Sequence, residues 1–120
     1  MGVREEIEAL FSTFTDKQKW TPENLAALYT DDCCIAWEGL SIKKKSELAE
    51  FFKSHVNNVD VTGITVHDVR ETGTGWAIVR GTATFKDKQS GTTPSAWYAT
   101  VVKKVGDCWK VHTDVGVNVK

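Results

Sequence analysis

Two ionisable side chains near the end of the chain are spaced to act together. His112 and Asp114 lie two residues apart in a stretch that alternates polar and apolar residues, which places both on one face of a strand, about 7 Å apart. A carboxylate at that distance can orient an imidazole as a general acid or base. Trp109, Val111 and Val115 occupy the opposite face, which is the better candidate for the core. We therefore expect His112 and Asp114 to lie at solvent or at a subunit contact, and they remain weak catalytic candidates.

Arg80 is a further charged candidate, within the largely apolar run 76–82. If its side chain faces a pocket, the guanidinium can bind a ligand carboxylate through two parallel hydrogen bonds. If it faces outward, it can pair with an acidic side chain at the surface or at an interface. The sequence leaves both interpretations open.

Aromatic side chains are numerous enough to line a binding pocket. Such a pocket would be largely apolar and would suit a flat or hydrophobic ligand. The alternative is that the same rings simply fill the core, as aromatics at helical spacing usually do. The candidate lining residues, with Arg80 beside them, are Tyr29, Trp37, Phe51, Phe52, Trp97 and Tyr98.

Composition favours one small globular domain spanning residues 1–120. Hydrophobic residues make up 41% of the chain and charged residues 26%, which is enough apolar surface for one core but not for two. The net charge of −1 supplies no general field for attracting nucleic acid. Because no apolar run approaches the roughly 18 to 20 residues that cross a bilayer, we expect no membrane association and a cytoplasmic location.

The cysteines predict neither disulfides nor a metal centre. Cys33, Cys34 and Cys108 are odd in number and two are adjacent, unlike the disulfide framework of a secreted domain. Neighbouring residues on a strand point to opposite faces, so Cys33 and Cys34 cannot easily share a tetrahedral zinc ion. We expect reduced structural thiols, no metal and no cofactor.

Helical patterns dominate the first half of the chain. Apolar residues recur on one stripe from Val3 to Phe14 and again from Leu48 through Phe52, as in amphipathic helices. Between them, Thr21 followed by proline and glutamate is a helix start, because threonine caps free N–H groups and proline suits the first position. This second helix is expected to place Tyr29 on its apolar side, and a short strand is expected over residues 33–37.

From residue 59 onward the pattern becomes that of strands. The segment is rich in valine, threonine and aromatic residues, and turn signals interrupt it at 72–75, 88–94 and 106–107. These breaks predict four long strands in hairpin order. Helices followed by consecutive strands are typical of an α+β fold, with the helices covering one face of a mostly antiparallel sheet.

Two segments carry a family resemblance. The run YTDDCCIAWEG (29–39) resembles the passage from second helix to first strand in the nuclear-transport-factor-2-like superfamily, and VKKVGDCWKVHTD (102–114) resembles its closing hairpin. The chain is thus identified as a SnoaL-like member over essentially its whole length. The resemblance implies a cone-shaped, cystatin-like α+β fold with three N-terminal helices against a strongly curved, mostly antiparallel sheet. It also implies a homodimer paired through the outer sheet face.

The resemblance also bears on catalysis. Isomerase-type members carry a carboxylate base just after the first strand, and Trp37 falls on that position in this chain. Glu38 follows one residue later, on the opposite face of an ideal strand unless a bulge redirects it. The expected base is therefore absent, which favours a protein that is not an enzyme.

Three functions remain open because the fold alone cannot select one. The first is a homodimeric, non-catalytic module that binds a small apolar ligand or associates with protein. The second is an isomerase, dehydratase or cyclase with an apolar substrate, using Glu38 or the His112–Asp114 pair; a carboxylate inside a deep cavity with a raised pKa would support it. The third is a transport or assembly adaptor.

Overall fold

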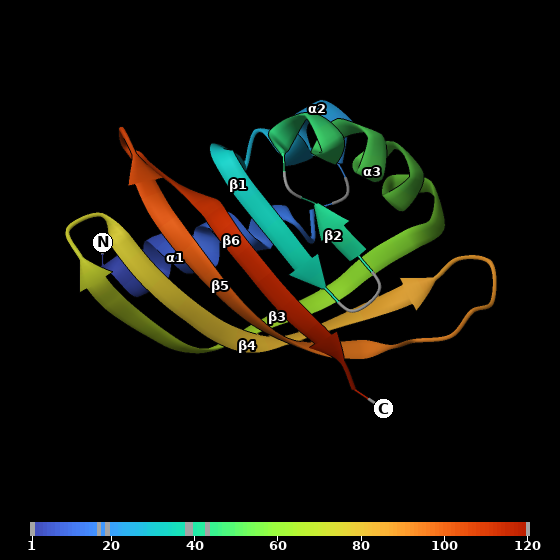
Figure 1. The fold of residues 1–120 in the computed structure, drawn as a ribbon. Helices are drawn as coiled ribbons and strands as arrows, with labels where there is room; N and C mark the ends of the chain where they lie inside the picture. The colour runs from blue at the N-terminus through green and yellow to red at the C-terminus, as the bar shows by residue number, and fades with distance from the viewer. Residues whose placement is uncertain (1, 17, 19, 38–39, 43, 120) are drawn as a thin grey trace.

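A strongly bent sheet with helices gathered on one side dominates the computed structural model (Figure 1). The structure describes residues 2–16, 18, 20–37, 40–42 and 44–119. The helices are α1 (Val3–Thr13), α2 (Pro22–Ala26) and α3 (Lys45–Asn58). The strands are β1 (Tyr29–Trp37), β2 (Leu40–Ile42), β3 (Val59–Gly73), β4 (Trp76–Asp87), β5 (Ser95–Val105) and β6 (Cys108–Asn118). This element order confirms the predicted α+β class.

The helices form where the apolar stripes and caps predict them. Helix α1 buries Ile7, Leu10 and Phe11, the centre of its stripe. The Thr21 side chain accepts a hydrogen bond of 3.0 Å from the backbone N–H of Asn24 and so caps α2. Helix α2 is shorter than expected and ends at Ala26. Tyr29 is consequently the first residue of β1 rather than part of the helix, which corrects the sequence prediction.

The sheet is mostly antiparallel, as predicted, with one parallel pairing. Its strand order is β2-β1-β6-β5-β4-β3, and β1 runs parallel to β6 while every other neighbouring pair is antiparallel. The four long strands from Val59 onward follow in hairpin order. Strand β2 was not predicted from the sequence, because three residues are too few to show a strand periodicity.

A bulge in β6 overturns the predicted assignment of its two faces. Val101 of β5 pairs with Thr113 while Val102 pairs with Val111, so His112 is an extra residue on β6. An extra residue reverses which side chains face inward beyond it. Before the bulge, odd-numbered residues such as Val111 are buried; after it, Asp114 faces the interior, and Val115 and Val117 are exposed. The two candidates His112 and Asp114 therefore do not share a face.

The main core lies between the helices and the concave face of the sheet. The longer strands contribute alternate residues to it, and the helices contribute their apolar stripes. The most deeply buried large side chains come from both layers, and they are Ile7, Leu25, Leu48, Val79, Val102 and Val111.

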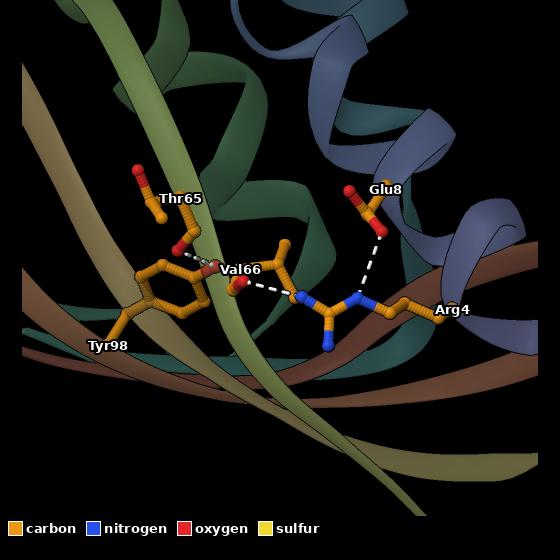
Figure 2. Close-up of polar contacts among 5 residues, drawn as sticks. All are labelled: Arg4, Glu8, Thr65, Val66 and Tyr98. Carbon is orange, nitrogen blue, oxygen red and sulfur yellow. Dashed lines mark hydrogen bonds and ion pairs between the residues drawn. The ribbon is translucent and has the colours of Figure 1, made fainter.

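A bulged region of β3 is held by side chains from two neighbouring elements. Figure 2 shows the Tyr98 hydroxyl of β5 donating to the Thr65 carbonyl at 3.1 Å and the Arg4 guanidinium of α1 donating to the next carbonyl, that of Val66, at 2.9 Å. Arg4 is itself paired with Glu8 at 3.1 Å. These contacts fix β3 where its pairing with β4 is irregular.

Gly81→Ala is expected to destabilise the protein by about 2 to 4 kcal/mol, measured by urea unfolding. A Cβ at Gly81 would collide with the Thr65 carbonyl and would lie 2.6 Å from the Tyr98 hydroxyl, so backbone would have to move. Gly73→Ala is the matched control, because nothing lies within 4 Å of its Cβ position. Equal stability losses for the two variants would contradict this explanation.

Candidate functional site

A cavity of about 440 Å³ opens inside the cone, bounded by α1, α3 and strands β1, β3, β4, β5 and β6. Its volume falls within the range of about 300 to 1,000 Å³ that is usual for small-molecule sites. Most of the wall is aromatic or aliphatic. The described residues that line it are Phe11, Phe14, Tyr29, Ile35, Trp37, Phe51, Phe52, Val59, Val61, Ile64, Ala83, Phe85, Asp87, Pro94, Tyr98, Thr100, Val111, Asp114 and Asn118.

Asp114 is a carboxyl group on this largely apolar wall. The Thr100 hydroxyl of β5 donates to its Oδ1 at 2.9 Å, directly across the β5–β6 pair. The Trp37 side chain of β1 donates a second hydrogen bond to the carboxylate. Three strands thus hold one ionisable group at the cavity surface. The accessible part of Asp114 faces the cavity, while protein atoms surround the rest.

The electrostatics of Asp114 are dominated by its surroundings. Burial raises the pKa of its carboxyl from 3.8 to about 6, although the hydrogen bonds from Thr100 and Trp37 favour the ionised form. Desolvation penalises the charged state more than two donors stabilise it. A carboxyl with a pKa near 6 can both gain and lose a proton close to neutral pH.

Two tyrosines near Asp114 stay protonated across the same pH range. Burial first, and the charge of Asp114 second, raise the pKa of Tyr29 and of Tyr98 above the ordinary value for a phenol. The Tyr98 hydroxyl is directed to the Thr65 carbonyl (Figure 2), which leaves its proton engaged within the protein.

Most of the predicted pocket residues lie on the cavity wall. These are Tyr29, Trp37, Phe51, Phe52 and Tyr98. Their rings also contact one another: Tyr29 and Phe52 have centroids 5.9 Å apart, and Phe51 and Phe52 are separated by 5.3 Å. Rings at these separations stabilise the wall that they form.

Arg80 and Trp97, in contrast, lie on the outer face of the sheet and not in the cavity. Val79 and Ala83 are the buried neighbours in β4, so strand alternation turns Arg80 outward, where it donates to Asp68 at 2.6 Å. Trp97 stands between two buried residues of β5 and leaves 55% of its surface exposed. Trp97 was a predicted pocket residue, and Arg80 was a pocket candidate whose orientation the sequence left open; the pleat of their strands turns both away from the cavity.

The other two acid–base candidates do not join Asp114. His112 lies at the bulge, where its ring packs edge-on against Trp76, with centroids 5.2 Å apart, and its Nε2 lies 3.4 Å from the carboxylate of Asp32. His112 therefore belongs to a partly exposed cluster on the far side of β6 from Asp114. Glu38 lies outside the residues that the structure describes.

Within the described ranges, no group of three or more histidine, cysteine or acidic side chains is arranged to hold a metal ion. Among the helices of those same ranges, none is both long enough and apolar enough to span a membrane.

Sequence reasoning missed two polar residues that line the cavity. Thr100 and Asn118 gave no signal, because a threonine and an asparagine in strands are ordinary. Gly116 did carry one: a glycine inside a strand often marks a close approach. A Cβ at Gly116 would lie 2.5 Å from the Trp37 ring, so glycine lets that ring pack against β6. Gly116 therefore faces inward, and with it Asp114 two residues earlier.

The fold agrees with a comparison against protein families. Residues 7–116 match the nuclear transport factor 2 (NTF2) domain. The chain therefore belongs to the NTF2 domain family, with its cystatin-like α+β fold. No curated protein matches the chain at a significant level.

Several solved structures have the same fold. A ketosteroid isomerase-like protein from Erwinia carotovora atroseptica is 22% identical, with a TM-score of 0.78 over 98% of this chain and 94% of the other. A proposed calcium/calmodulin-dependent protein kinase II association domain from Xanthomonas campestris is 20% identical, with a TM-score of 0.80 over 99% and 89%. A proposed scytalone dehydratase from Novosphingobium aromaticivorans is 16% identical, with a TM-score of 0.77 over 98% and 84%. Identities this low establish the fold alone.

Proposed function

We propose that the cone binds a small, mostly apolar ligand, which Asp114 orients through its polar group. The observation that carries this proposal is the cavity of about 440 Å³ with an aromatic and aliphatic wall and the hydrogen-bonded carboxyl of Asp114 on its surface. Apolar walls supply most of the binding free energy, and a few fixed polar groups supply orientation. Phe11 and Phe52 are buried parts of this wall, so the pocket is built from the core rather than from loops.

Titration calorimetry with 1-naphthalenemethanol tests the proposal, because this probe is neutral, flat and small enough for the cavity. We expect one binding site per chain with a negative heat-capacity change, which marks the burial of apolar surface. Absence of binding at millimolar probe would contradict the proposal.

A second candidate function is acid–base catalysis at Asp114. The specific observation in its favour is the pKa of about 6 for a carboxyl that lines a cavity. Two of the similar structures are described as a ketosteroid isomerase-like protein and a proposed scytalone dehydratase. In this candidate the base comes from β6, because Trp37 occupies the position expected for an isomerase base on β1.

Proton exchange at the carbon next to a ketone tests directly whether Asp114 acts as a base. With 2-tetralone in D₂O, NMR should detect faster deuterium incorporation in the presence of the protein. Replacement of Asp114 by asparagine should remove about 10² to 10⁴ of the acceleration, the usual contribution of a general base. Equal exchange rates for both proteins would exclude Asp114 as a base for this substrate class and leave the binding function standing.

We also propose that two copies pair through the outer sheet face. Apolar side chains are exposed across three neighbouring strands of that face, namely Ile78, Trp97, Val115 and Val117. Exposed apolar groups in one patch are typical of protein contacts. One similar structure is described as an association domain, which is consistent with a family fold that serves assembly.

Trp97→Glu is expected to shift a dimer to monomers, because it places a charge on the middle strand of the patch, beside Val117. Sedimentation velocity at micromolar protein measures the change. Val105→Glu is the control, since Val105 is comparably exposed but lies at the tip of the β5–β6 hairpin. A wild-type protein that sediments as a monomer would refute pairing.

We propose a cytoplasmic location because the cysteines are reduced. Cys33, Cys34 and Cys108 are all free thiols, and Cys33 is buried. Free thiols are maintained in reducing compartments.

A further inference from the structure

The described wall of the cavity is acidic and carries no basic side chain. Asp114 and Asp87 contribute carboxyl groups, and none of the described lining residues is lysine, arginine or histidine. Asp87 is already engaged, because its Oδ1 accepts the backbone N–H groups of Gln89 and Ser90 in the loop after β4. Asp114 is therefore the acidic group of the described wall that is available to bind a ligand.

Asp114 retains hydrogen-bond acceptors for such a ligand. A carboxylate offers about four acceptor sites, and Thr100 and Trp37 use two of them. The hydroxyl protons of Thr100 and Tyr98 are committed to Asp114 and to the Thr65 carbonyl. A ligand entering this region consequently finds a free acceptor, while these two hydroxyl donors are already occupied.

The aromatic rings also favour a positively charged ligand. Phe14, Tyr29 and Phe52 form a continuous series with centroid separations of 6.0 and 5.9 Å, and Trp37 packs edge-on against Phe85 at 6.0 Å. The faces of aromatic rings are negative and attract cations, most strongly where water is excluded. Rings around an acidic group are a usual environment for a bound ammonium ion.

We propose that the cone selects amines with an apolar body, whose ammonium group hydrogen-bonds Asp114 while the hydrocarbon part packs on the rings. The inference rests on the proposed binding function and names the ligand class for the same site. A carboxylate ligand would meet a like charge without a compensating cation. A neutral alcohol could donate one hydrogen bond but would lack the charge–charge attraction.

Three naphthalene probes of almost equal shape separate these possibilities. 1-Naphthylmethylamine is a cation at pH 7.5, 1-naphthalenemethanol is neutral and 1-naphthoate is an anion. By calorimetry at pH 7.5 we expect the amine to bind at least about tenfold more tightly than the alcohol, as suits a hydrogen bond to a charged group, and the anion to bind most weakly.

Asp114→Asn is the test variant and Asp68→Asn the matched control, because Asp68 is an acid on the outer face. Asp114→Asn should reduce amine affinity at least to that of the alcohol, because the charge is removed, and should leave alcohol affinity within about twofold, because the asparagine oxygen still accepts hydrogen bonds. Asp68→Asn should change neither affinity.

Each contrary outcome has a distinct meaning. Alcohol binding without an amine advantage in the wild-type protein would overturn the amine proposal and leave the binding function intact. An amine advantage that survives in Asp114→Asn would overturn the assignment to Asp114. Failure of all three probes to bind would reject the proposed binding function itself.

Discussion

Asp114→Asn is expected to make the protein more stable at pH 8, by about 1 to 3 kcal/mol. The wild-type carboxyl has a pKa of about 6 in the folded protein against an ordinary value of 3.8. A difference of that size corresponds to about 3 kcal/mol of destabilisation once the group is ionised in both states. Asparagine has nearly the same shape but carries no charge, so it removes the desolvation penalty. Asparagine accepts the hydrogen bonds from Thr100 and Trp37 less strongly than a carboxylate does, and this loss sets the lower end of the range.

The sign of this effect depends on pH in a defined way. A carboxyl whose pKa is raised by folding binds protons more readily in the folded state, so stability falls as pH rises from about 4 to about 6. Well below pH 3.8 the group is protonated in both states, so the variant should lose most of its advantage by pH 4 and the rest at lower pH. Urea unfolding of both proteins at pH 4 and pH 8 measures the change.

Asp68→Asn provides the control of opposite sign. A hydrogen bond from Arg80, together with the nearby Arg70, lowers the pKa of Asp68. Ionised Asp68 therefore favours folding at neutral pH, and its replacement should lower stability there. An Asp114→Asn protein that gains nothing at pH 8 relative to pH 4 would show that Asp114 is well solvated, which contradicts the buried site described above.

Ala83→Trp is expected to weaken the binding of 1-naphthalenemethanol by at least about thirtyfold, which is about 2 kcal/mol. Ala83 is 5% exposed and lines the cavity, so an indole at this position enters the space that the probe would occupy. The added ring is almost as large as naphthalene and is held there covalently. Binding should therefore be lost through occupation of the site, while the outer surface stays unchanged.

Ala99→Trp is the matched control for this substitution. Ala99 is an exposed residue of β5, and Arg80, which it pairs with in β4, points outward from the same sheet. Calorimetry should give wild-type affinity for this variant. Circular dichroism should confirm that both variants fold, because overpacking can cost about 1 to 3 kcal/mol. Equal affinities of the two tryptophan variants would place the bound probe outside the cone.

Most of the fold could be predicted from local patterns. The stripe that buries Ile7, Leu10 and Phe11 and the Thr21 cap are encoded within a few residues of one another. The long strands are set off by turns at which Gly75 and Gly106 adopt positive φ angles of 77° and 63°. Such signals depend on short stretches of chain, so a single sequence reveals them.

The site could be predicted only in part, because the position of Asp114 depends on the register in which β6 pairs with β5. Alternation in β6 suggested one face for Val111 and Val115, but the extra residue His112 moves Asp114 to the cavity side. A bulge arises from pairing with the neighbouring strand and leaves no repeat in the sequence. Aromatic residues were easier to place where buried neighbours were recognisable, whereas Trp97 was misplaced because its hydrophobicity suggested the interior.

The fold is shared by proteins described as isomerase-like, dehydratase and association domains, so the wall of the cone must decide what this member does. Here the wall combines apolar rings with the carboxyl of Asp114 held by Thr100 and Trp37. That combination suits ligand binding directly, and it provides an ionisable group in the range where proton transfer is possible.

The indole N–H signals in a ¹H–¹⁵N NMR titration with 1-naphthylmethylamine test ligand binding inside the cone most directly. Trp37 lines the cavity and donates to Asp114, whereas Trp97 is exposed on the outer face. We predict that the Trp37 signal shifts on addition of the amine, saturating at one ligand per chain, while the Trp97 signal stays in place. A shift of Trp97 with an unchanged Trp37 would place the ligand on the outer sheet face and contradict a binding site in the cone.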